Sequence, residues 1–213
     1  MQKKGAAREH ISLFPSAGLK CWFAGSTAAF RMSLPDFSSV AARICGSCGM
    51  CCNGVMFHLV KLQPGDSPKM LAALGLKVKR KRKQDCILQP CPAHDGCRCT
   101  IYESRPVRCR IFECRQLRRI AAGTISEAEA LQKTSEAKIL VSEINSLLLR
   151  LGATNSKQPL VMRCKSVESG PSDSTSDEIA MNIRSQLARA IDDLEVLLDR
   201  HFRIEAVGLS DYS

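Results

Sequence analysis

Cys45-Gly-Ser-Cys48-Gly-Met-Cys51-Cys52 places four thiols within eight residues of a 213-residue chain. Packing alone does not require cysteines at this spacing, so thiols this close are expected to form disulfides, bind metal or react. Each Cys-x2-Cys step lets two sulfurs converge on one ion, and Gly46 and Gly49 allow the backbone to turn tightly. The stretch therefore predicts a loop that supplies part of a metal site, with the remaining ligands further along the chain.

The cysteine content also bears on the compartment. The chain holds 12 cysteines, which would indicate disulfides in a secreted protein. The first residues are basic, but Pro15, Lys20 and several serines interrupt every apolar run that could serve as a signal peptide. No stretch is long enough to span a membrane. We therefore expect a cytoplasmic protein, because clustered cysteines in a reducing compartment usually bind metal.

Positive charge and cysteine are both concentrated in the first 120 residues of the chain. Residues 1–120 hold 21 Lys and Arg against 7 Asp and Glu, a balance of +14, whereas residues 121–213 hold 10 against 14, a balance of −4. Eleven of the 12 cysteines lie in the first part, and Cys164 is the exception. Metal-bound cysteines are thiolates, so the arginines nearby are expected to act as their counter-charges.

The chain divides into three predicted parts. Residues 1–31, with Cys21, form a loose tail or an upstream start. Residues 33–122 form a small α+β domain, with a buried strand over 55–60, a short helix over 69–74 capped near Asp66, and a helix over 110–120. His58, within that strand, is expected to be an ordinary core or partly exposed histidine rather than a ligand.

The third part, residues 124–204, is predicted to be a helical hairpin. A capping box at Thr124 or Ser126 begins a helix that runs to Leu151, and a second helix runs from Glu178 to Phe202. Both are amphipathic, so each needs an apolar partner, and antiparallel pairing satisfies both. Residues 166–177 are too polar to bury a core and are predicted to be a linker.

The second group of cysteines runs from Cys86 to Cys114 and includes Cys97, with Pro90, Pro92 and Gly96 indicating a loop. Zinc would be satisfied by Cys45 and Cys48 with two cysteines of this group. An iron-sulfur cluster suits the Cys-x2-Cys-x2-Cys step, although the full ferredoxin run is absent because Cys52 directly follows Cys51. A thioredoxin-like redox site lacks its βαβ context. Zinc and iron-sulfur both remain open.

The segment Cys99-Thr-Ile-Tyr102-Glu-Ser-Arg105-Pro-Val-Arg-Cys109-Arg110-Ile-Phe-Glu-Cys114, together with Cys-x2-Cys-x2-Cys-Cys, resembles the YkgJ-type cysteine-cluster proteins, described as zinc- or iron-chelating domains. The resemblance covers about residues 37–120 and implies eight metal-ligating cysteines: Cys45, Cys48, Cys51, Cys52, Cys91, Cys99, Cys109 and Cys114. Cys86 and Cys97 are extra to this pattern. The stretch at 45–52 is then expected to be split between two centres, or between one centre and a packing role.

Two arginines of the same segment, Arg105 and Arg110, are predicted to donate charge-assisted hydrogen bonds to bound sulfurs or to a carboxylate, and thus to support the cofactor. Beyond metal binding, two other roles are open. The flagellin lysine methylases carry a similar cysteine cluster, so the resemblance also allows methyl transfer from S-adenosylmethionine. Alternatively, the basic run Lys77–Lys83 would suit a nucleic-acid or protein adaptor, although an edge strand blocked by lysines explains it better, because no aromatic residues that could stack on bases are interleaved with the charges.

Overall fold

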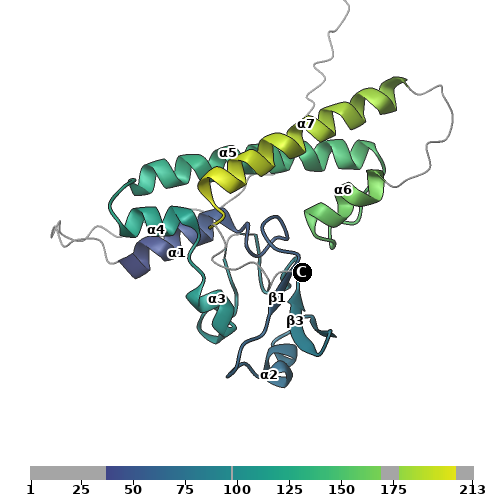
Figure 1. The fold of residues 1–213 in the computed structure, drawn as a ribbon. Helices are drawn as coiled ribbons and strands as arrows, with labels where there is room; N and C mark the ends of the chain where they lie inside the picture. Colours follow the sequence, from purple (N-terminus) through teal and green to yellow (C-terminus); the bar gives the residue numbers. More distant parts are fainter. Residues whose placement is uncertain (1–36, 97, 169–177, 205–213) are drawn as a thin grey trace, which may run out of the picture. The chain divides into compact units, whose positions relative to one another are not determined.

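The structure is a computed structural model that describes residues 37–96, 98–168 and 178–204. The chain divides into two compact units, residues 1–32 and 33–213, and every described residue belongs to the second. The expected tail with Cys21, residue Cys97 and most of the expected linker lie outside the described residues. The elements follow in the order α1 (Phe37–Cys48), β1 (Leu59–Lys61), α2 (Pro68–Ala73), β2 (Val78–Lys81), β3 (Gln84–Leu88), the 3-10 turn η1 (Tyr102–Ser104), α3 (Val107–Ile111), α4 (Arg115–Ala121), α5 (Glu127–Arg150), α6 (Leu160–Glu168) and α7 (Glu178–His201) (Figure 1).

A small antiparallel sheet and a set of helices confirm the predicted α+β class. β3 lies between β1 and β2, and Ile87 at its centre pairs with Val60 on one side and with Val78 on the other. Ile87 is buried together with Leu71 of α2, so this helix covers the sheet. The strand predicted over 55–60 is wrong in its bounds, because residues 55–58 form turns and the strand occupies Leu59–Lys61 only.

The basic run forms a charged edge, as one of its two interpretations predicted. β2 pairs with β3 alone, so its other edge carries no strand within the described sheet. Lys79, Arg80 and Lys81 are all exposed. The turn to β3 places Arg82 and Lys83 at φ values of 46° and 68°, the left-handed region seen in tight hairpin turns. Lysine along such an edge discourages pairing with a strand of another chain.

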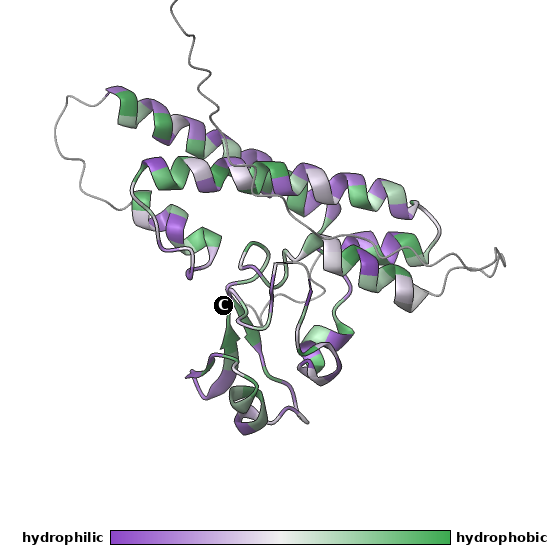
Figure 2. Cartoon of the chain, turned by 180° about the vertical axis from the view of Figure 1, so that it is seen from behind, coloured by the Kyte–Doolittle hydropathy of each residue, from purple (hydrophilic) through white to green (hydrophobic). Residues whose placement is uncertain are grey.

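The predicted pair of long helices is present. Ser126 caps α5 in a reciprocal capping box with Glu129, and α5 and α7 pack along each other in opposite directions (Figure 1). Both helices alternate hydrophobic and hydrophilic residues along their length (Figure 2). Ile144, Leu148 and Leu198 are 0% exposed in the core between them, which explains why two amphipathic helices of otherwise polar sequence are stable together.

Three local predictions need correction. Cys45 and Cys48 lie in the last turn of helix α1 rather than in a loop, because Val40 and Ile44 pack against α4 and α5. The helix predicted over 110–120 is two helices, since Phe112 is extended and Cys114 starts a new helix as its N-cap. α6 reaches Glu168, so the first residues of the expected linker are helical.

The cysteine-bearing region and the long helices share cores. Met50, inside the Cys45–Cys52 stretch, is 1% exposed and belongs to the core of α5 and α7. On α1, Arg43 forms an ion pair with Glu127 at the start of α5, with 2.7 Å between guanidinium and carboxylate. The Cys45–Cys52 stretch is therefore fixed to α5, and the domain boundary expected at residues 122–124 stays a prediction.

Candidate metal centre

The turn that carries Cys51 and Cys52 is built on Gly49. Its φ of +66° ends α1, which only glycine does at little cost, and its amide donates to the carbonyl of Cys45 at 3.0 Å. Its carbonyl accepts from the amide of Cys52 at 2.8 Å. With buried Met50 as an anchor, these bonds fold the chain back so that four thiols leave one compact turn.

Four of the eight predicted ligands form what we term the Cys45 set, which consists of Cys45, Cys48, Cys51 and Cys114. Cys114 contributes from the start of α4, and its charge raises the pKa values of the other three, so all four thiols are near neighbours. Burial is the largest cause of each shift and raises the pKa of Cys45 to about 11 and of Cys48 to about 12. Cys45 is the most exposed member, so the set retains contact with solvent.

The other four form the Cys52 set, which consists of Cys52, Cys91, Cys99 and Cys109. Burial raises the pKa of Cys52 to about 12, and the next causes are the charges of Cys91, Cys109 and Cys99. Cys91 is tied to the turn directly, because its amide donates to the carbonyl of Cys52 at 2.7 Å. Cys51 and Cys52 are thus adjacent in sequence but have their principal thiol neighbours in different sets, although each is also affected by one member of the other set.

Contacts outside the thiols hold the remote members in place. Arg115 follows Cys114, and its guanidinium donates to the last carbonyls of α7, those of Asp199 at 2.8 Å and Arg200 at 2.9 Å. Cys109 lies on α3, whose first amide, that of Val107, donates to Asp66 at 2.8 Å. Both remote cysteines therefore depend on contacts with distant parts of the chain.

The chain directs positive groups at the sulfurs. The Met50 amide donates to the Cys48 sulfur, and the Ala93 and His94 amides donate to the Cys91 sulfur. The Cys114 sulfur accepts from backbone amides at the start of α4. Each of these hydrogen bonds lowers the pKa of the thiol that accepts it. The Arg105 guanidinium lowers the pKa values of Cys45 and Cys109, one in each set. N–H donors and cations of this kind stabilise thiolate over thiol.

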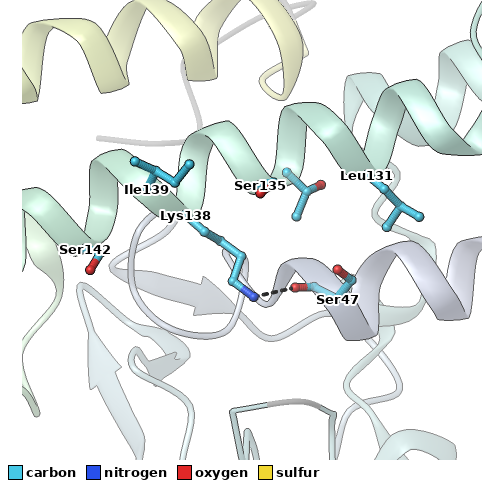
Figure 3. A pocket seen from close by; sticks show the side chains of 7 residues that line it. Ser47, Leu131, Ser135, Lys138, Ile139 and Ser142 are labelled. Carbon is cyan, nitrogen blue, oxygen red and sulfur yellow. Dashed lines mark hydrogen bonds between the residues drawn. The ribbon is translucent and has the colours of Figure 1, made fainter. Parts of the chain in front are cut away.

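Lys138 adds a second cation on the α5 side. Its ammonium donates to the carbonyl of Ser47 at 3.2 Å and lowers the pKa of Cys48, and it lines a shallow pocket of about 280 Å³ between α5 and the end of α1 (Figure 3). Lys138 and the half-buried histidine His94 were not among the residues predicted from the sequence, whereas Gly49 was expected to allow the tight turn. A lysine on a long polar helix carries no local sign that it approaches a thiol.

The two predicted arginines and the extra cysteines differ in placement. Arg105 stacks on Tyr102, 3.6 Å from the ring centroid, and lies near both sets, whereas Arg110 is exposed on α3 and is not among the chief causes of any cluster pKa shift. Cys86 is buried on β3, where its thiol donates to the carbonyl of Gln84 at 3.6 Å, away from either set. Cys164 lies in the helical core. His58 is exposed, as one of its expected placements allowed.

The donor chemistry of both sets fits zinc or iron, because soft thiolate sulfur is the preferred ligand of these metals in proteins. None of the ten described cysteines is in a disulfide. Within the described residues, however, no three His, Cys, Asp or Glu side chains stand close enough together to hold an ion as they are placed. The sets are groups of neighbouring thiols rather than closed ligand shells, and their role as ligands stays a prediction.

Comparison with known proteins agrees with this chemistry. Residues 44–138 match the sequence model of a family named CxxCxxCC and described as a "putative zinc- or iron-chelating domain". The matched stretch contains all eight cysteines of the two sets and ends at Lys138. Searches of curated proteins and of solved structures found no match to the chain. In the described part of the chain, no helix is both long and apolar enough to cross a membrane.

Proposed function

Residues 44–138 belong to the CxxCxxCC family of cysteine-cluster domains, and from this premise we propose that the protein binds two metal centres, one at each four-cysteine set. The observation that carries the proposal is the division of the eight thiols into two groups of four neighbours. Four thiolates are the number of ligands that a tetrahedral zinc ion needs, and also the number that holds one iron-sulfur cluster.

We assign an iron-sulfur cluster to the Cys45 set. Its members are a Cys-x2-Cys-x2-Cys run, Cys45 to Cys51, and one distant cysteine, Cys114, which is the ligand pattern of bacterial ferredoxin clusters. The Cys52 set has no such run, and its four widely separated cysteines suit a single zinc or iron ion equally well. Arg105, near both sets, offsets part of the negative charge that eight thiolates create.

The test measures the iron, sulfide and zinc content of protein purified without oxygen, for the wild type and for three serine variants. Cys114→Ser should remove the metal of the Cys45 set, Cys109→Ser that of the Cys52 set, and Cys86→Ser neither, because Cys86 lies outside both. A colourless wild type with only zinc would overturn the iron-sulfur assignment. A folded protein without any metal, or loss of all bound metal in each of Cys114→Ser and Cys109→Ser, would overturn the two-centre proposal.

A second function, nucleic-acid binding by a metal-stabilised adaptor, is supported by the β2–β3 hairpin. Its cations at positions 79–83 are all exposed, on an edge strand and a turn. Replacing these five residues with serine should flatten the salt dependence of RNA or DNA binding, because each lost phosphate contact reduces the slope of log K against log salt by about 0.7 to 0.9. An unchanged slope would leave only the edge-protection role for this run.

A further inference from the structure

One imidazole nitrogen inside the cysteine region has no hydrogen-bond partner. Nε2 of His94 is buried, and no described group donates to it or accepts from it. Leaving a buried polar atom unpaired is costly, because it loses its hydrogen bonds to water and gains none in return, so native proteins rarely keep one. The described residues, as they are placed without metal, therefore leave this nitrogen without the partner that its burial calls for.

The ring of His94 lies against the turn of the Cys45 set. A Cβ added to Gly49 would be 2.7 Å from Nε2 and 2.8 Å from Cε1, closer than side chains tolerate. Gly49 lies between Cys48 and Cys51, two members of the set. Glycine is thus required here twice, for its positive φ and for the space that the imidazole occupies.

The backbone of His94 belongs to the other set. The His94 amide donates to the carbonyl of Cys91 at 3.1 Å and also to the Cys91 sulfur. His94 also pairs with Cys99 in an isolated antiparallel β-bridge. His94 therefore connects a loop that carries two thiols of the Cys52 set with the turn that carries three thiols of the Cys45 set.

We propose that His94 donates a hydrogen bond through Nε2–H to a metal-bound thiolate of the Cys45 set, and so positions and stabilises that centre. The inference rests on the proposed function, since it requires metal at this set. Each set already offers four sulfurs, so the imidazole is not needed as a ligand, whereas thiolates bound to metal accept N–H donors that strengthen metal retention and tune potential. His94 then supplies N–H donors to both sets, its imidazole to the Cys45 set and its backbone amide to Cys91 of the Cys52 set.

The test compares His94→Leu, which keeps volume but loses the donor, with His94→Gln, whose amide still donates. Protein purified without oxygen is mixed with EDTA, and the release of iron and zinc is followed together with the absorption spectrum. We expect His94→Leu to lose the metal of the Cys45 set about 10–100-fold faster, the usual effect of an outer-shell partner, and to show a shifted thiolate-to-metal band. His94→Gln should recover part of both. His201→Leu is the matched control, because His201 also has a buried, unpartnered Nδ1 but lies among Lys133, Arg200 and Arg119 rather than cysteines.

Four results separate the possibilities. Wild-type release and spectrum in folded His94→Leu would overturn the inference while leaving the proposed function intact. Stoichiometric loss of one metal in both His94 variants would make His94 a ligand instead of a donor. If His94→Leu fails to fold, the absorption spectrum of His94→Gln tests the proposal instead. A thiolate-to-metal band at the wild-type position, together with about tenfold faster metal release, would mean that His94 acts only by packing and would overturn the proposed hydrogen bond. Absence of metal from the wild type would overturn the proposed function and this inference together.

Discussion

The strongest quantitative prediction concerns proton release when metal-free protein binds a thiophilic metal. Burial raises the pKa of Cys45 to about 11 and of Cys48 to about 12, places that of Cys51 well above its usual value of 9.0, and also raises that of Cys114. Cys45, Cys48 and Cys51 are therefore protonated at pH 9, and Cys114 is more than half protonated there. Each must lose its proton to become a ligand.

The magnitude follows from these pKa values. At pH 9 a thiol of ordinary pKa near 9 is half ionised, so a set of four exposed thiols would release about two protons per centre, whereas the Cys45 set should release more than about three. The metal affinity of the Cys45 set should correspondingly keep rising with pH from 9 toward 11, by about three decades per pH unit, because Cys45, Cys48 and Cys51 each still have to lose a proton there. Below pH 7 the same protons compete with the metal and should weaken binding steeply.

The assay adds Cd²⁺, which takes the same thiolate ligands and stays dissolved at pH 9, to unbuffered metal-free protein and measures the base needed to hold the pH. The protein denatured in urea serves as the reference with exposed thiols. A release near two protons per bound ion in the folded protein would refute the burial of the set. The raised pKa values also give a sign for stability. Well below pH 9 the thiols are neutral in both states and the metal-free fold keeps its full stability. Stability falls as the pH rises through 9 toward 11, because the unfolded chain ionises there before the folded chain does.

Three further predictions concern substitutions. Gly49→Ala should destabilise the protein by about 1–2 kcal/mol from its positive φ alone, with further loss from the displaced imidazole, and chemical denaturation measures the sum. Arg105→Gln should speed metal release to a chelator several-fold, because it removes a cation near both sets, while Arg110→Gln, matched in chemistry but exposed, should not; equal effects would contradict the placement of these arginines. Leu148→Ala, at a fully buried site, should lower the free energy of unfolding by about 2–5 kcal/mol, whereas Leu149→Ala, at a side chain 55% exposed, should change it by less than about 1 kcal/mol.

Local signals in the sequence predicted the helical part well. The capping box at Ser126 and Glu129 and the apolar stripe of α5 depend only on residues a few positions apart, so periodicity was sufficient to place both long helices. The same reasoning missed α1, because its last turn is occupied by glycine and cysteines, which in sequence resemble a loop. It also joined α3 to α4, because the break at Phe112 is associated with a distant contact, the edge-to-face packing of Phe112 on Phe57 with ring centroids 5.1 Å apart.

The sequence by itself determined the chemistry of this protein: the eight thiols, the α+β class and the amphipathic helices are all readable from residue type and spacing. Only the tertiary structure decided how the thiols are grouped. Cys51 and Cys52 are adjacent, and nothing local distinguishes them, but contacts through Arg115 to α7 and through Asp66 to α3 place Cys114 near one and Cys109 near the other. Grouping depends on chain segments far apart in sequence, and so does the place of His94 over Gly49, because such contacts form only when the whole domain has folded.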